Sequence, residues 1–254
     1  MDTSVLPIII LLPLILGTTL VSQLQRISRG VTALGAIGIS LSCFILLLSQ
    51  AETVLQGHAI QQSWNWIPQL GINLSFRLDA LGLLFGLLIS GIGTLIYIYA
   101  YYYLSPKNSL AKLYQLLMLF MAAMLGISLS NNLIILLVFW ELTSISSFLL
   151  VGHWSQYDAA QRGARMALTI TGMGALAMLG GFVLLGQITG TYQIDQLVLM
   201  KDSIQQHQLF IPTLLLILLG AFTKSAQFPF HFWLPNAMAA PTPVSAYLHS
   251  ATMV

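Results

Sequence analysis

Long apolar runs separated by short polar stretches fill the chain from its beginning. A run of about 20 apolar residues is long enough to cross the roughly 30 Å hydrocarbon core of a bilayer as one helix. Seven runs of this kind are present, and an eighth begins near Val244. The predicted spans are 4–22, 30–49, 78–103, 112–129, 132–151, 164–188 and 208–227. The pattern therefore predicts an all-α, polytopic membrane protein.

The longest polar interruption, near residues 50–77, lies between the second and third predicted spans. Its tryptophans, Trp64 and Trp66, are typical of the aromatic belt at a membrane interface. Apolar and polar residues alternate from Ile72 to Asp79. This period-two pattern fits a short strand outside the membrane, and an irregular loop that caps the bundle is the alternative. Asp79 is interpreted as a helix N-terminal charge or a partner of Arg77, and an ion ligand is the alternative.

Composition supports this class and excludes others. Hydrophobic residues make up 57% of the 254 residues and charged residues only 6%, whereas soluble domains contain about 25% charged residues. The net charge of +2 comes from too few residues to form a nucleic-acid surface. A single cysteine, Cys43, excludes an internal disulfide and a cysteine metal cluster. The first residues lack a basic segment, so we expect the first span to be retained rather than removed as a signal peptide.

The basic residues predict an orientation, because cytoplasmic connections of membrane proteins are enriched in lysine and arginine. Three alternate connections, which must lie on one side of the membrane, carry most of them: Arg26, Arg29, Lys107, Lys112, Arg162 and Arg165. The opposite side holds Arg77 and Lys201. We therefore expect the N-terminus to face away from the cytoplasm.

One carboxylate, Glu141, falls near the middle of the fifth predicted span. A charge at this depth costs about 2.5–3.5 kcal/mol on insertion scales, so it should face the bundle interior rather than lipid. A buried ion pair with a purely structural role is the alternative interpretation.

Lys224 follows the apolar run from Leu209 to Leu219 and is the natural counter-charge of Glu141. A charged residue inside a membrane span indicates a functional site when it has a partner or a water-lined cavity. An acid and a base that move relative to each other can load and release a proton. Such a pair is what a pump or an antiporter requires.

Prolines interrupt the chain after Lys224, because proline lacks a backbone donor and restricts the preceding residue. The four in this stretch are Pro229, Pro235, Pro241 and Pro243. Broken helices at membrane depth often line ion paths in transporters. His231 and His249 lie in the same stretch and can titrate near neutrality, which makes them candidate proton relays. Hydrogen-bonded packing histidines are the alternative.

The segment from Phe139 to Ser144 and the segment from Gly220 to Val254 closely resemble one known family. It is the antiporter-like family, which includes the large A subunit of Mrp-type Na⁺/H⁺ antiporters and the proton-translocating membrane subunits of complex I. The resemblance covers essentially the whole chain. Gly152-His153-Trp154 and Ala226-Gln227-Phe228-Pro229-Phe230-His231 look more like the Mrp A subunit than a respiratory subunit.

The resemblance implies a role for each candidate residue. Glu141 matches the fifth-span glutamate of the family, and Lys224 matches the seventh-span lysine paired with it. His249 matches the eighth-span residue that passes protons toward the membrane centre. His231 matches a histidine in the second part of a broken seventh helix. No cofactor is implied, and no residue here is assigned to a Na⁺ site.

The family fold implies two inverted repeats of five helices, the first running from the fourth to the eighth span. Residues 1–110 would then form three N-terminal transmembrane helices with an external loop, and residues 111–254 the first repeat. Family members continue for several more helices, so the first repeat is expected to be incomplete at its C-terminus. The chain is then a fragment of a longer product, or another chain supplies the second half.

The implied function is proton translocation coupled to Na⁺/H⁺ exchange in a multisubunit Mrp-type antiporter of a bacterial plasma membrane. The expected partners are other membrane subunits, protons, Na⁺ and lipid. The alternative is a proton-pumping membrane subunit of an NADH:quinone oxidoreductase. Its redox centres would reside on partner chains, because these residues build no catalytic or redox centre. Seven helices with a lysine in the seventh also outline a retinal-binding protein, against which the proline-rich continuation argues.

Overall fold

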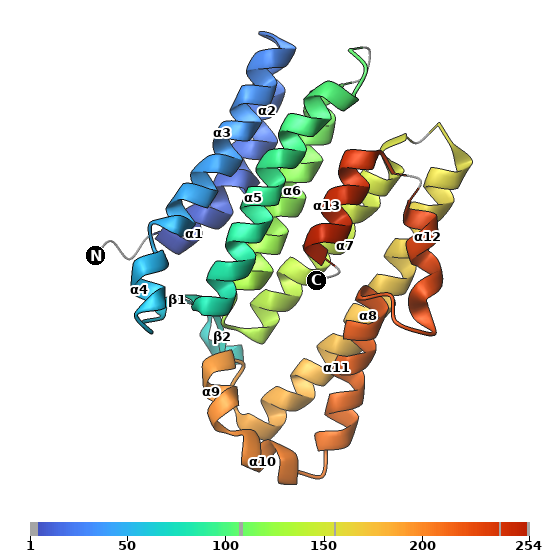
Figure 1. Ribbon diagram of the computed structural model, residues 1–254. Coiled ribbons are helices and arrows are strands. Elements are labelled where there is room, and N and C mark those ends of the chain that lie inside the picture. The colour runs from blue at the N-terminus through green and yellow to red at the C-terminus, as the bar shows by residue number, and fades with distance from the viewer. Residues whose placement is uncertain (1–4, 107–108, 155, 239, 253–254) are drawn as a thin grey trace.

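The computed structural model describes residues 5–106, 109–154, 156–238 and 240–252, which are mostly helical (Figure 1). Within these ranges six helical spans are long and apolar enough to cross a membrane: Val5–Leu24, Arg29–Leu55, Ala80–Tyr103, Leu110–Leu129, Leu133–Trp154 and Asp158–Thr189. The first six predicted spans are therefore confirmed. The seventh predicted span contains a shorter apolar helix, Phe210–Lys224, so a count of seven stays a prediction.

The first five spans contain seven α-helices, with a π-helical turn at Leu12–Gly17 between the first two. Their bounds are α1 Val5–Leu11, α2 Thr18–Leu24, α3 Arg29–Leu48, α4 Ala51–Leu55, α5 Ala80–Tyr103, α6 Leu110–Leu129 and α7 Leu133–Val151. Four of these helices start with a side-chain cap: Ser28, Asp79 and Ser109 each accept a bond from a backbone N–H three residues later, and Asn132 caps α7. The interpretation of Asp79 as an N-terminal helix charge is confirmed.

A β-hairpin joins the second and third spans. Strand β1 (Ile60–Ile67) pairs antiparallel with β2 (Ile72–Leu78), with a bulge between Asn65 and Ile67. The strand predicted from the alternation is confirmed, and the irregular loop is wrong. Its partner β1 was not predicted, because its first half, Ile60-Gln61-Gln62-Ser63, does not alternate and most of its residues are exposed.

The remaining helices are α8 Asp158–Thr189, α9 Ile194–Leu199, α10 Lys201–Gln206, α11 Phe210–Lys224, α12 Trp233–Ala237 and α13 Thr242–Thr252. Helix α8 begins before the predicted start at residue 164, with Asp158 in its first turn, where a carboxylate complements the helix dipole. Arg162 and Arg165 consequently lie on this helix rather than in the connection before it.

Helix α7 stands between two groups of helices (Figure 1). On one side it packs against α6, the most buried span, which is surrounded by α1, α2, α3 and α5. On the other side it packs against α8, which also carries α11 and α12. Helix α13 returns to α5, where the Tyr247 hydroxyl donates a hydrogen bond of 2.9 Å to the Ile89 carbonyl.

The two ends of the bundle differ. The connections α2–α3, α5–α6 and α7–α8 lie at one end, and the hairpin, α9 and α10 lie at the other (Figure 1). At the hairpin end, Asn131 joins distant segments, because its N–H donates to the Ser75 carbonyl and its carbonyl accepts from the Ile194 N–H, both at 2.8 Å. Of the basic residues used to predict the orientation, Lys107 lies outside the described residues.

Candidate functional site

Helix α7 carries Glu141 near its middle, as the sequence predicts. The helix is fixed at its start by Asn132, whose Oδ1 accepts hydrogen bonds from the N–H groups of Ile134 (3.0 Å) and Ile135 (3.4 Å). The Thr143 hydroxyl is fully buried and donates back to the Trp140 carbonyl at 2.7 Å. This self-contained bonding lets polar side chains occupy the interior of an apolar bundle without unsatisfied donors.

Lys224 is the last residue of α11 and points at α7. Its Nζ donates a hydrogen bond of 2.9 Å to the Ser144 Oγ. The same Nζ lies 5.8 Å from the centroid of the Trp140 ring, within the range of a cation–π interaction. The lysine therefore contacts the face of α7 that also carries its predicted partner.

The helix that carries Lys224 ends immediately after it, earlier than the proline predicts. The Gln227 N–H donates to the Phe222 carbonyl at 2.9 Å, and Ala226 between them has a φ of 52°. This is the bonding of a Schellman motif, in which the residue after the C-cap is left-handed and is usually glycine. An alanine there stores strain directly beside the lysine.

A tryptophan stabilises this helix end from the far side of the break. Trp233 in α12 donates its indole N–H to the Thr223 carbonyl at 2.9 Å. Thr223 is one of the last residues of α11, whose carbonyls have no partner within the helix. The interruption predicted from the prolines is therefore present between α11 and α12, and the hydrogen bond of Trp233 links its two sides.

Glu141 and Lys224 do not form a direct ion pair. Within the described ranges the one side-chain pair with a nitrogen–oxygen distance below 4 Å is Arg77 with Asp79, at 3.7 Å. Glu141 Oε1 is buried and has no hydrogen-bond partner among the described residues. Glu141 lies three residues before Ser144, whose Oγ accepts the hydrogen bond from Lys224 Nζ. The structure thus brings the predicted pair to one site, with Ser144 as the group that the lysine touches.

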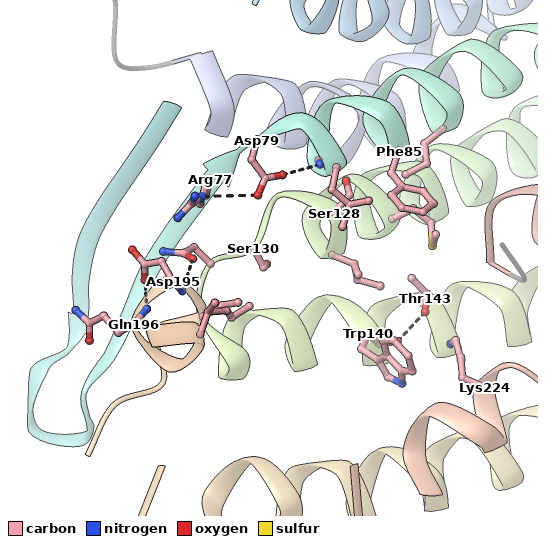
Figure 2. Close-up of a pocket in the computed structure, with 18 of the residues that line it drawn as sticks. Arg77, Asp79, Phe85, Ser128, Ser130, Trp140, Thr143, Asp195, Gln196 and Lys224 are labelled. Atoms are coloured by element: carbon pink, nitrogen blue, oxygen red, sulfur yellow. Dashed lines mark hydrogen bonds and ion pairs between the residues drawn. The ribbon is translucent and has the colours of Figure 1, made fainter. Parts of the chain in front are cut away.

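A cavity of about 910 Å³ reaches from the hairpin end of the molecule to Lys224. Figure 2 shows Trp140, Thr143 and Lys224 at one end of it and Arg77, Asp79 and Asp195 at the other. Its lining between these ends is largely apolar and comes from α5 and α6. The lysine therefore has a route toward the hairpin end of the bundle.

A second, much smaller cavity lies on the other side of Lys224. Its volume of about 30 Å³ is enough for a water molecule, which needs roughly 10–15 Å³ and two to four polar partners. The polar side chains on its wall come from α7, α8, α11, α12 and α13: Thr143, Ser147, Thr171, Lys224, Trp233 and His249. His249 Nε2 is buried and has no partner among the described residues. Lys224 and His249 thus line the same small cavity.

The other candidate histidine lies apart from this cluster. His231 is exposed on the short turn Phe230–Phe232, where its ring stacks on Phe228 with 5.8 Å between centroids. It is absent from the linings described above for both cavities. The structure therefore brings Lys224 and His249 to one cavity and leaves His231 outside, while Glu141 lies on α7 three residues before Ser144, which Lys224 contacts.

Sequence reasoning missed Trp140 and Ser144 as the direct contacts of the lysine. Their spacing of four residues places both on one face of α7, next to Glu141, which is a signal that the sequence does carry. What the sequence lacks is the packing of α11 against that face.

Two family models match the chain, one of them over the site. Residues 130–254, from the start of α7 to the end, match the model described as "NADH:quinone oxidoreductase/Mrp antiporter, TM". Residues 64–114 match the model described as "NADH-Ubiquinone oxidoreductase (complex I), chain 5 N-terminus". The chain belongs to the antiporter-like family of membrane subunits. The resemblance inferred from the sequence is confirmed.

Named relatives of this antiporter-like chain are components of ion antiporters. It is 51% identical over 226 residues to the A/B subunit of a probable K⁺/H⁺ antiporter of Rhizobium meliloti, which is 89% of this chain and 23% of the relative. It is 47% identical over 251 residues to the A1 subunit of a Na⁺/H⁺ antiporter of Staphylococcus aureus, which is 99% of this chain and 31% of the relative. The antiporter-like chain thus spans about a quarter to a third of the length of these relatives.

A solved structure has the same fold. In "Structure of Mrp complex from Dietzia sp. DQ12-45-1b", one chain superposes with a TM-score of 0.83 at 32% identity. The match covers 96% of this antiporter-like chain and 27% of that chain. Together with the six apolar spans, this similarity identifies a multi-pass integral membrane protein.

Proposed function

We propose that this chain is a membrane subunit of a multisubunit Mrp-type Na⁺/H⁺ antiporter and translocates protons coupled to Na⁺ exchange. The observation that carries the proposal is the position of Lys224, which lines both cavities and whose Nζ bonds Ser144 on α7, three residues after Glu141. A lysine in this place can receive a proton from one cavity and release it to the other. The antiporter names of relatives at 47–51% identity support the Mrp type.

In the proposed mechanism Lys224 exchanges its proton by a small movement of Nζ. Near the Glu141 carboxylate, the ammonium is stabilised by the opposite charge. Near Ser144 it keeps a hydrogen bond but has left direct contact with that charge. The proton can then pass through a water in the small cavity to His249 Nε2, which has no other partner among the described residues. His231, on the far side of the break, is proposed as a later group on an exposed route.

We further propose the repeat architecture of the family for this chain. In it α11 and α12 are the two parts of a broken seventh span, and α13 begins the eighth. Residues 1–110 form the three N-terminal transmembrane helices with the external hairpin, and residues 111–254 belong to the first of two inverted five-helix repeats. The greater length of the relatives supports a second repeat, carried by the same product or by another chain.

The proposed location is a bacterial plasma membrane with the N-terminus facing away from the cytoplasm. Arg26, Arg29 and Lys112 lie at or beside connections at one end of the bundle, and the hairpin with Arg77 lies at the other. Lysine and arginine are enriched on the cytoplasmic side, which supports this orientation. Labelling of single introduced cysteines by an impermeant reagent would test it.

A proton-pumping subunit of an NADH:quinone oxidoreductase is the second candidate, because both family models carry that description. The two functions differ in their partner chains. Iron–sulfur or flavin proteins that co-purify with the complex would favour the respiratory function. Membrane subunits without such redox proteins would accompany an Mrp-type antiporter.

The test is cation-dependent exchange in everted membrane vesicles of an antiporter-deficient bacterium that expresses the complete complex. We expect NaCl to collapse an imposed pH gradient, with KCl as the comparison because one relative is named for K⁺. Lys224→Ala and Glu141→Ala should abolish exchange while the complex still assembles on native gels. Normal Na⁺/H⁺ exchange in either variant would overturn the proposal.

A further inference from the structure

Lys224 contacts the side chain of Ser144, and the surroundings of Ser144 indicate what this contact does. The side chain is 1% exposed, and its Oγ accepts from Lys224 Nζ at 2.9 Å while it can donate to the Trp140 carbonyl at 3.4 Å. Lys224 is partly buried, and an ammonium withdrawn from water without a hydrogen-bond acceptor carries a desolvation cost. Ser144 supplies that acceptor without supplying a charge.

The helix geometry places Ser144 between two different neighbours of the lysine. With 3.6 residues per turn, Ser144 lies about 40° around α7 from Trp140 and about 60° from Glu141. In the structure Nζ lies on the Trp140 side, 5.8 Å from the ring centroid and outside ion-pair distance of Glu141. Glu141 Oε1, buried and without a partner among the described residues, marks the other side as available.

We infer that Ser144 is a positioning residue that holds Lys224 away from Glu141. The Trp140 ring, which contacts the same Nζ, acts together with it. The inference rests on the proposed function of the Glu141 and Lys224 pair. Nζ can turn about the Ser144 hydroxyl from the ring to the carboxylate and keep one hydrogen bond throughout. Without the hydroxyl, Glu141 is the remaining acceptor on this face, and the lysine is held in a direct ion pair that does not release its proton.

Ser144→Ala, Ser144→Cys and Ser144→Thr in the complete complex separate this role from simple packing. We expect exchange turnover to fall about tenfold in the alanine variant, as for loss of one hydrogen bond to a charged group. The threonine variant should stay within about twofold of the parent, because it keeps the hydroxyl. The apparent KM for Na⁺ should not change, since Ser144 does not bind the cation in this scheme. Should the alanine variant fail to assemble, the cysteine variant gives the same comparison.

A packing role predicts the opposite order. Alanine is smaller than serine and fits the site, whereas the extra methyl of threonine would crowd a fully buried position. Equal or higher turnover in Ser144→Ala than in Ser144→Thr would therefore overturn the inference. Ser146→Ala is the matched control, because Ser146 is equally buried on α7, faces about 200° away, and bonds only its own helix, with its hydroxyl 2.7 Å from the Leu142 carbonyl.

Substitutions of Trp140 provide a second, independent test of the positioning role. Trp140→Phe keeps a ring face under the ammonium and should retain most turnover, while Trp140→Leu removes the cation–π interaction and should reduce it several-fold. Loss of exchange in Lys224→Ala with unchanged exchange in Ser144→Ala and Trp140→Leu would refute the positioning role alone. Unchanged exchange in Lys224→Ala would refute the proposed function instead.

Discussion

The close approach of α11 to α8 decides where Lys224 lies, and Gly220 is the residue that permits it. Gly220 is buried one helical turn before Lys224, on the same face of α11. A Cβ on Gly220 would lie 2.7 Å from the Gly174 carbonyl oxygen and 2.7 Å from the Met178 Cβ. Because an ordinary contact begins near 3.4 Å, Gly220→Ala must separate the two helices locally by about 0.7 Å.

A shift of that size is small for stability and large for the site. Overpacking of this kind costs about 1–3 kcal/mol, which an assembled membrane complex can tolerate. A displacement of about 0.7 Å along the bond from Lys224 to Ser144 would lengthen it from 2.9 Å to about 3.6 Å, which is no longer a hydrogen bond. We therefore expect Gly220→Ala to assemble normally and to lose at least about tenfold in exchange turnover.

The assay is the NaCl-induced collapse of a pH gradient in everted vesicles, normalised to the amount of complex on native gels. Gly180→Ala is the matched control, because a Cβ there would lie at an ordinary 3.6 Å from Leu216 Cδ1 in the same α8–α11 interface. It should retain full exchange. Exchange at the parental rate in Gly220→Ala would refute the claim that this helix separation positions the lysine.

Two further predictions concern the helix ends that hold the bundle. Asn132→Ala removes the side-chain cap of α7 and should lower the stability of the folded complex by about 1 kcal/mol. We expect the purified complex to melt at a lower temperature and to keep its exchange rate. An unchanged melting temperature would contradict this prediction. Arg29→Ala should expose the α5–α6 connection to protease, because Arg29 Nη2 donates to the carbonyls of both Tyr101 and Leu104 and alanine has no donor there; equal cleavage of variant and parent would contradict that account.

The pattern of apolar and polar residues located the six apolar spans. A helix inside a membrane must satisfy all of its backbone hydrogen bonds internally and present apolar side chains to the lipid, which produces long apolar runs. It failed for β1, which has three consecutive polar residues after Ile60 and is held in place by pairing with β2. It also misplaced the end of α11. The proline at 229 predicted the break, but a left-handed Ala226 ends the helix first.

Individual charged residues indicated the members of the site in advance. Glu141 and Lys224 were recognisable as candidates because inserting a charge into a membrane span costs free energy, so charges there usually have a function or a partner. The sequence made both His249 and His231 candidate relays, with His249 the stronger of the two. The structure separates them, because α13 packs back toward α5 and α7 and brings His249 to the cavity of Lys224, whereas His231 remains exposed on its turn.

The sequence by itself determined that the chain is a multi-pass membrane protein of the antiporter-like family, with an acid and a base at membrane depth. Those features depend on residue type and spacing, which the linear order contains. Only the tertiary structure decided that Lys224 contacts Ser144 and Trp140 rather than the Glu141 carboxylate. The contacts of Lys224 depend on how closely α11 approaches α8, because this distance sets where the lysine meets α7. Side chains far apart in the chain determine that distance.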